Sequence, residues 1–480
     1  MFKHKKIVSA VFISLFGSAS VHASVDLIAI GGISGAYEDL STQTAAPLEN
    51  GIPGNRLGGM GSGFAYAGGT TFVALPDRGP NANAYNSLVD DTVSYIDRFQ
   101  TINMSLAPSY KGAPLPFTLT PTMRKTTLLS SPTPLVYGTG AGLNLPSGVP
   151  ALNAVNHTHY FTGRSDNFDP NKLSTNPANA RLDPEAIRVS NDGKSVFVSD
   201  EYGPVVYQFN RKTGKRVKSF KLPDNLAISH LSSQKSVEKD KTLNPTGRVT
   251  NKGMESLAIT PDGKKLVGMM QKGLQQDDKH NLRIVTIDIE TGVTHEYVYR
   301  VTDGSGVSAM VAINDHQFLV DERKGSGMAD TPLITDVASP AEVKELFLID
   351  LDGAQDVTDK SDANGDDLEQ YAVPKTLFLD IVAKLNAAGI DSYLIPSKIE
   401  GVTFGQDVVI NGETKHTLFI ANDNDFLPVI ADPFKVPGDP TRGIIPNPNK
   451  YYVFAFGDED LPGYVPQQFN LHSRKMHDAD

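Results

Sequence analysis

The 480-residue chain contains no cysteine. Disulfide frameworks, thiolate catalysis and cysteine metal sites are therefore excluded. Beyond the N-terminus no apolar run approaches the roughly 20 residues that a membrane-spanning helix needs. Basic residues are also scarce, since 44 Lys and Arg stand against 55 Asp and Glu, for a formal net charge of −11. Because nonspecific nucleic-acid binding requires a positive surface, we expect no nucleic-acid partner. Because no apolar run is long enough, we also expect no membrane insertion.

The first 23 residues have the three parts of a secretory signal. A basic start that contains Lys3 precedes an apolar run over 7–16, and Val21-His22-Ala23 is a small-x-small cleavage site. The sequence predicts a signal peptide over 1–23 and a single mature domain over 24–480. The protein is then exported, periplasmic or extracellular. A membrane anchor is the alternative interpretation of the same residues.

Repeated strand patterns organise the mature chain. Segments 185–201, 255–271 and 400–423 each contain a strand, a turn and a second strand, and the first two turns are Asp-Gly. Asp-Gly between β-rich runs is a strong hairpin signal. Two weaker copies at 64–79 and 310–323 lack the leading Glu. Further strand pairs follow at 205–220 and 283–299, and repeated units of four short strands are typical of propeller blades.

The sequence therefore predicts an all-β fold, a β-propeller with five readable blades and long inter-blade insertions. The insertions at 126–182 and 359–397 are expected to hold a sixth blade, which makes six the expected count. A strand at 25–30 is expected to pair with 451–456 and so remove an exposed edge. Residues 377–388 have the spacing of a short helix. A β-sandwich is the alternative architecture.

Each full copy of the repeat begins with a glutamate, at Glu185, Glu255 and Glu400. The residue after each Glu is small, which permits the close approach that inner strands need. Equivalent blades would bring these three carboxylates to one mouth of the central channel. Like charges that converge there raise one another's pKa unless a cation joins them.

The second strands end in polar clusters that would surround the same mouth. Oxygen-rich and sulfur-free, such a site suits Ca²⁺, which takes six to eight oxygen ligands. The expected metal ligands are Asp77, Glu185, Asp200, Glu255, Asp321, Glu322, Glu400 and Asp423. The alternative is that each acid binds the backbone of its own turn.

Three arginines lie in clusters that contain an aspartate. Arg78, Arg164 and Arg323 could each hold a phosphate through two parallel hydrogen bonds. Together with Glu201 they form the expected catalytic set. Structural ion pairs with their acidic neighbours are the alternative.

Several passages resemble the phytase-like family, described as "esterase-like activity of phytase", over nearly the whole mature chain. The passages are Asn55 to Gly63, Pro76 to Asn81, Phe161 to Asp169, Asp183-Pro184-Glu185, Ser199 to Gly203, Gly253-Met254-Glu255, Leu319 to Arg323 and Ala421 to Asp425. The resemblance implies a β-propeller. By analogy with β-propeller phytases, it also implies an acidic channel in which calcium ions bridge enzyme and phosphate.

The sequence thus predicts an exported, calcium-dependent phosphoesterase, phytase-like in the broad sense, with a small phosphorylated substrate. A non-catalytic ligand- or protein-binding propeller is the first alternative, and a metal-dependent carboxyl-ester or lactone hydrolase is the second. Ser62 lies in Met-Gly-Ser-Gly-Phe, which does not match a nucleophile elbow at its first position. A serine esterase is therefore not indicated.

Overall fold

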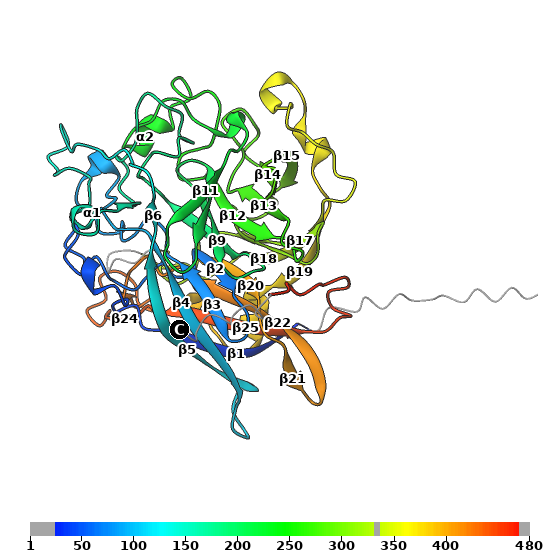
Figure 1. Ribbon diagram of the computed structural model, residues 1–480. Coiled ribbons are helices and arrows are strands. Elements are labelled where there is room, and N and C mark those ends of the chain that lie inside the picture. The colour runs from blue at the N-terminus through cyan, green and yellow to red at the C-terminus, as the bar shows by residue number, and fades with distance from the viewer. Residues whose placement is uncertain (1–24, 331–336, 470–480) are drawn as a thin grey trace, which may run out of the picture.

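The computed structural model describes residues 25–330 and 337–469, so the predicted signal at 1–23 lies outside the described residues. Short antiparallel strands dominate this part of the chain, and the four-stranded sheets fan around one centre (Figure 1). The first sheet contains β2 (Gly63–Tyr66), β3 (Thr71–Leu75), β4 (Arg98–Pro108) and β5 (Phe117–Leu128). The second contains β8 (Pro184–Val189), β9 (Ser195–Asp200), β10 (Val205–Asn210) and β11 (Arg216–Phe220).

Two more sheets follow the same plan, in which each strand pairs with the next along the chain. The third contains β12 (Met254–Ile259), β13 (Lys265–Met270), β14 (Asn281–Asp288) and β15 (Thr294–Arg300). The fourth contains β16 (Gly306–Ala312), β17 (Gln317–Arg323), β18 (Lys344–Asp350) and β19 (Lys375–Asp380).

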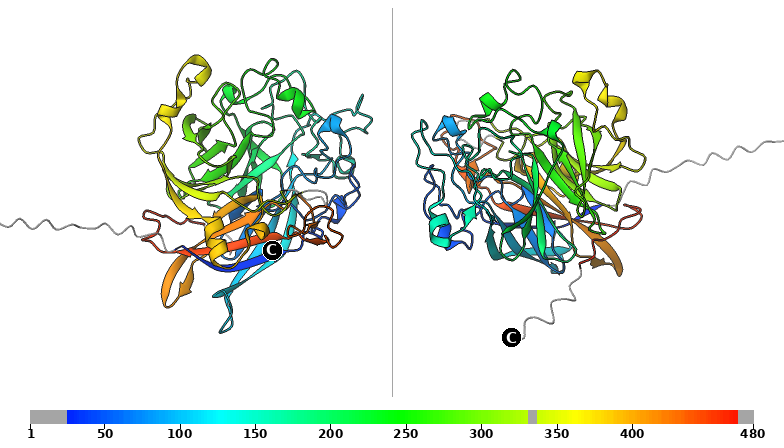
Figure 2. Two further views of the ribbon diagram at one scale, coloured as in Figure 1. Left: turned by 180° about the vertical axis from the view of Figure 1, so that it is seen from behind. Right: turned by 45° about the horizontal axis from the view of Figure 1, so that its top comes forward.

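The fifth sheet joins the two ends of the described chain. It contains β20 (Ile399–Phe404), β22 (Glu413–Asn422), β25 (Asn449–Phe456) and β1 (Asp26–Ile33), and β21 (Val408–Ile410) pairs with β22. Antiparallel pairing runs from Asp26 opposite Ala455 to Ile33 opposite Asn449, so the predicted pairing of these strands is confirmed. The blue β1 lies along the red β25 in the views of Figures 1 and 2.

The innermost strands form a closed ring. β2 contacts β8, β8 contacts β12, β12 contacts β16, β16 contacts β20, and β20 returns to β2. The small residues predicted to allow this approach are needed, because a Cβ on Gly401 would lie 2.7 Å from the Phe64 Cβ. Apolar side chains from neighbouring sheets fill the space between the blades, as where Phe197 and Phe220 meet Leu257 and Val285. The described chain is therefore a β-propeller with five blades.

The insertions that were expected to hold a sixth blade contain no four-stranded sheet among their described residues. Residues 126–182 form the end of β5, helix α1 (Ala151–Asn156) and the pair β6 (Ser130–Ser131) and β7 (His159–Tyr160). Residues 359–397 supply β19 and helix α3 (Ile381–Ala387). The helix predicted over 377–388 is therefore shorter, because 375–380 pair with β18 and Asp380 accepts the first-turn hydrogen bond from Ala383.

Short elements complete the described chain. They are α2 (Lys235–Glu238), β23 (Val429–Ala431), β24 (Ile444–Pro446) and the 3₁₀ turns Thr42–Thr44, Ser87–Val89, Asp224–Leu226, Asp362–Asn364, Leu368–Tyr371 and Ser392–Leu394. Among the described residues, no helix has the length and apolar character to cross a membrane.

One buried arginine closes the channel between the inner strands. Arg188, which is 5% exposed, donates hydrogen bonds to the backbone carbonyls of Phe64, Ile187, Met310 and Val402. The four carbonyls lie on the inner strands of four different blades, β2, β8, β16 and β20. Residues 464–467 pack below, around a cavity that Arg188 also lines. Arg188 therefore spans the centre of the inner ring at this level.

Candidate active site

A β-bulge occurs at the same place in four of the five inner strands. The pairing register gains one residue within Glu185–Ala186 in β8, at Glu255 in β12, at Ser308 in β16 and at Glu400 in β20. A bulge turns the extra side chain away from the regular alternation of the strand. In the two blades that lack the Glu, serine takes this position, as Ser308 and, before β2, as Ser62. We call these five residues the inner tier.

The second strands supply a matching set of residues. In each blade, the second residue after the inner-tier residue is apolar and pairs with a residue of the second strand. Three positions after that paired residue, the chain has a polar or charged side chain. These residues, the outer tier, are Asp77, Glu201, Gln271, Arg323 and Asp423.

Hydrogen bonds and ion pairs join the two tiers around the axis. Gln271 donates to Glu255, and Arg323 forms an ion pair with Glu400 and donates to Ser308. Burial, together with the charges of Glu255 and Asp183, raises the pKa of Glu185 well above its usual range. Burial and the charges of Glu201 and Glu400 do the same for the pKa of Glu255. The three glutamates singled out from sequence therefore face one shared region.

Two groups of carboxylates are close enough to share an ion. Asp183, Glu185 and Glu201 form one group, in which the nearest oxygens all lie within 4.8 Å of one another. Asp77, Asp423 and Asp425 form the other, with the same limit. Both groups lie at the same end of the channel, because the charge of Asp183 also helps to raise the pKa of Asp77.

Basic side chains already neutralise part of this charge. Lys398 Nζ lies 2.6 Å from a carboxylate oxygen of Asp423 and 2.6 Å from one of Asp425. Arg78 forms an ion pair with Asp183 and lies 3.6 Å from Glu201. In the second group an ammonium therefore lies between Asp423 and Asp425, whereas the first group has a guanidinium on one side.

Several buried carboxylate oxygens have no partner among the described residues. At the axial end they are both oxygens of Asp97, both oxygens of Asp321 and Oε2 of Glu255, and Oε1 of Glu296 on β15 is a further one elsewhere. Asp97 and Asp321 are fully buried, and an unpaired buried carboxylate is costly unless it is protonated or binds a cation. Oxygen donors without sulfur or imidazole match the preferences of Ca²⁺. The residues present therefore fit such an ion.

Three of the residues predicted for the site have other roles. Glu322 alternates with Asp321 along β17, so it points away from the axis and forms an ion pair with Lys375. Arg164 pairs with Asp166 at 2.6 Å and with Glu49 at 3.5 Å.

Asp200 accepts hydrogen bonds from the backbone of Asp183, Tyr202 and Gly203, so it fixes its own turn, as the alternative interpretation expected. The remaining predicted residues are those at or beside the two tiers.

Other site residues were missed from sequence. Asp183 and Lys398 each stand two positions before an inner-tier glutamate, a regularity that the repeats contain. Asp425 follows Asp423 in the same polar cluster. Asp97 lies just before β4, on a third strand, and nothing in the repeat pattern marks it. Its place near the axis follows from the charges of Asp183 and Asp200, which add to burial in raising its pKa.

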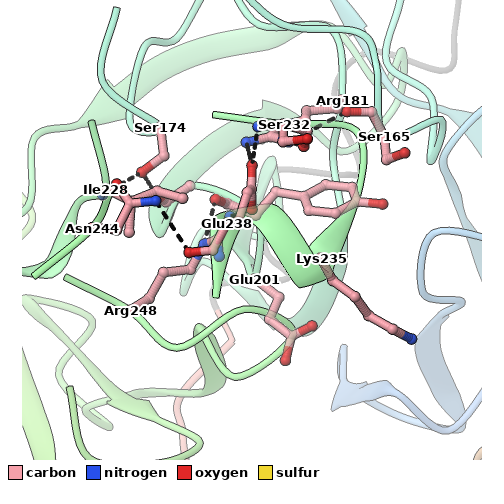
Figure 3. Close-up of polar contacts among 12 residues, drawn as sticks. Ser165, Ser174, Arg181, Glu201, Ile228, Ser232, Lys235, Glu238, Asn244 and Arg248 are labelled. Atoms are coloured by element: carbon pink, nitrogen blue, oxygen red, sulfur yellow. Dashed lines mark hydrogen bonds and ion pairs between the residues drawn. The ribbon is translucent and has the colours of Figure 1, made fainter. Parts of the chain in front are cut away.

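A polar cleft opens beside Arg78, and we call it the vestibule. It has a volume of about 160 Å³ and is lined by Arg78, Asn81, Asp90, Asp91, Thr92, Ser165, Arg181, Tyr202, Ser232, Lys235, Glu238, Thr250 and Asn251. Glu238 on α2 holds its wall in place through ion pairs to Arg181 at 2.9 Å and to Arg248 at 2.6 Å (Figure 3).

The raised pKa values predict how metal-free protein responds to pH. Burial raises the pKa of Asp321 and of Glu201 to about 7, against about 4 in an unfolded chain. Between about pH 4 and pH 7 the folded state therefore keeps protons that the unfolded state has released, and stability from these groups falls as pH rises through this window. If calcium binds these carboxylates, it competes with those protons, so its stabilising effect should grow over the same range.

Thermal unfolding of metal-free protein, with and without added CaCl₂, measures this effect at about pH 5 and about pH 7.5. A calcium concentration of about 100 Kd adds about 2.7 kcal/mol where the carboxylates are ionised. We expect a clear rise in Tm at the higher pH and a smaller one at the lower. Equal shifts at both pH values would contradict the involvement of these carboxyl groups.

Fold and site together define a β-propeller with a carboxylate-rich polar site at one end of its axis. The chain belongs to the phytase-like family: the model described as "Esterase-like activity of phytase" matches residues 55–426. Both carboxylate groups lie within that span. Family and fold support a phytase-like hydrolase in general terms.

Relatives add little beyond the family. An "Uncharacterized secreted protein" from Arthroderma benhamiae is 36% identical over 137 residues, which cover 24% of this chain and 26% of that protein. The chain thus matches about a quarter of that relative's length. A luciferin-regenerating enzyme aligns over 84% of this chain and 94% of its own, at 10% identity and a TM-score of 0.31. A putative 6-phosphogluconolactonase from Bacteroides uniformis aligns over 81% and 86%, at 11% identity and a TM-score of 0.28. Likeness at this level carries no inference about activity.

Proposed function

We propose that the protein is an exported, calcium-dependent phosphoesterase that acts on small phosphate esters at the axial site. The observation that carries this proposal is the excess of buried carboxylates over bases, with unpartnered oxygens on Asp97, Asp321 and Glu255. The signal pattern at 1–23 and the name of the Arthroderma benhamiae relative, a secreted protein, support export.

Calcium is proposed to be held by Asp183 and Glu185, with Asp97 close by, so that Glu201 beside them keeps the role of an acid. When bound there, the ion would neutralise phosphate charge and lower the pKa of a bound water. The other group is a poorer candidate, because Lys398 lies between two of its three carboxylates.

Arg78 is placed to bind the phosphate of a substrate. Its side chain is 15% exposed, it lines the vestibule, and its Nε–H has no partner among the described residues. Asp183 pairs with a different nitrogen of the guanidinium, Nη1. An arginine held in this way can donate to a phosphate oxygen without losing its structural ion pair.

Glu201 can serve as the proton donor. Burial and the charge of Asp183 raise the pKa of Glu201 to about 7, so near neutral pH a fraction of the side chain carries a proton. As water attacks phosphorus and the ester bond breaks, the leaving oxygen would take that proton. The vestibule, with its hydroxyl and amide side chains, would receive the alcohol that leaves.

Phosphate release from p-nitrophenyl phosphate and from phytate tests the proposal, with CaCl₂ and with chelator. We expect release that depends on calcium and stops on chelation. Carboxyl-ester and lactone substrates are assayed in parallel, because turnover on those alone would replace the phosphoesterase with the other hydrolase. Calcium binding by calorimetry without turnover on any substrate would instead indicate a binding propeller.

A further inference from the structure

A second cleft lies at the outer edge of the first two blades, away from the axial site. It has a volume of about 450 Å³. The end of β5, the turn between β10 and β11, the segment from α1 to β7 and residues 40–43 form its walls. It shares no lining residue with the vestibule or with either tier.

The charge of this cleft is opposite to that of the protein. Lys125, Lys212, Lys215, His157 and His159 line it, and none of its described lining residues is Asp or Glu. The chain as a whole has a formal net charge of −11. Burial, followed by the positive charges of Lys212 and Arg211, lowers the pKa of Lys125. The bases therefore repel one another, and an anion between them would relieve that repulsion.

Unpartnered hydroxyl groups also mark the cleft. The Ser41 Oγ and Thr127 Oγ1 atoms are buried and have no hydrogen-bond partner among the described residues, and both residues line the cleft. Ser41 is 7% exposed and Thr127 is 4% exposed. A buried hydroxyl is normally paired, so a ligand with several acceptor oxygens would satisfy these donors.

We propose that this cleft binds a multiply charged tetrahedral oxyanion, of the phosphate or sulfate class. The lysines supply charge, while the serine and threonine hydroxyls supply donors on the inner wall. A hard cation such as Ca²⁺ does not fit, because the described lining lacks carboxylates. The cleft is thus an anion site independent of the axial site, and its occupancy needs no calcium.

Binding of inorganic tripolyphosphate, and of inorganic sulfate in a second series, tests this proposal. Calorimetric titrations with chelator present keep the axial site free of metal. The variant K212Q/K215Q removes two exposed charges whose side chains lie on the cleft. We expect its Kd for tripolyphosphate to rise about tenfold, with an affinity that also falls as salt increases.

K111Q/K172Q is the matched control, because Lys111 and Lys172 are exposed and outside the cleft. It removes the same net charge and should leave the Kd within about twofold, since distant exposed charges are largely screened. An equal loss in both double variants would show that binding follows net charge alone and would overturn the proposal. So would an unchanged Kd in K212Q/K215Q. Phosphate release at the axial site is measured separately, so failure of the anion-site proposal would not count against the proposed phosphoesterase.

Discussion

Glu185→Gln is expected to lower calcium-dependent phosphate release by at least about 100-fold. Loss of residues that only support metal ligands typically costs 10–100-fold, and Glu185 is proposed to be a ligand itself. Glutamine keeps the shape of the side chain but removes the charge from the group that also contains Asp183 and Glu201. Steady-state phosphate release and calcium titration by calorimetry measure the two effects.

The same change should not weaken the metal-free fold. Burial and neighbouring charges raise the pKa of Glu185 well above its usual range, which shows that its ionised form is disfavoured when no cation is bound. A neutral amide avoids that cost, so the Tm of the metal-free variant should equal or exceed that of the parent.

Glu290→Gln is the control, because Glu290 lies exposed in the turn after β14. Release by Glu185→Gln within about threefold of the control, with unchanged calcium affinity, would show that Glu185 is not a ligand.

The arrangement of strands into blades could be predicted from sequence because the strands and turns of a propeller have local sequence patterns. An Asp-Gly turn sets the first hairpin of the second and third blades, and a glutamate followed by a small residue marks three of the five inner strands. The closing pair of β1 and β25 was also readable, since an unpaired edge at either end would be exposed. The sequence did not reveal whether a long insertion forms a blade of its own or only a loop. The insertion at 126–182 therefore looked long enough for a blade, although it forms only α1, β6 and β7 outside the ring.

The candidate site was readable only in part, for a geometric reason. Alternation along a strand decides which of two adjacent acids faces the axis, and a bulge shifts that alternation by one residue. Asp321 and Glu322 are adjacent, and only the structure separates the axial one from the one that binds Lys375. Asp97 could not be recognised as a site residue from sequence, because the third strand of a blade seldom reaches the axis. Asp97 lies just before such a strand, β4.

Arg188→Met is expected to lower the free energy of unfolding by about 3–5 kcal/mol. A buried acceptor left unsatisfied costs about 1–3 kcal/mol, and this change removes a donor from four carbonyl groups. The guanidinium binds four carbonyl groups on the inner strands, and methionine would fill the space but leave those acceptors without a donor. Burial, without a compensating carboxylate, lowers the pKa of Arg188 to about 9, so removing its charge recovers part of the loss.

Urea unfolding monitored by circular dichroism measures this effect, with the midpoint and slope fitted separately. Arg124→Met is the control, because Arg124 lies exposed on β5 and should change stability by less than about 0.5 kcal/mol. Arg188→Lys should fall between the two, since an ammonium has three donors but lacks the planar fork of the guanidinium. If Arg188→Met were as stable as the control, the carbonyls would have other donors. The inner ring would then not depend on this residue for its closure.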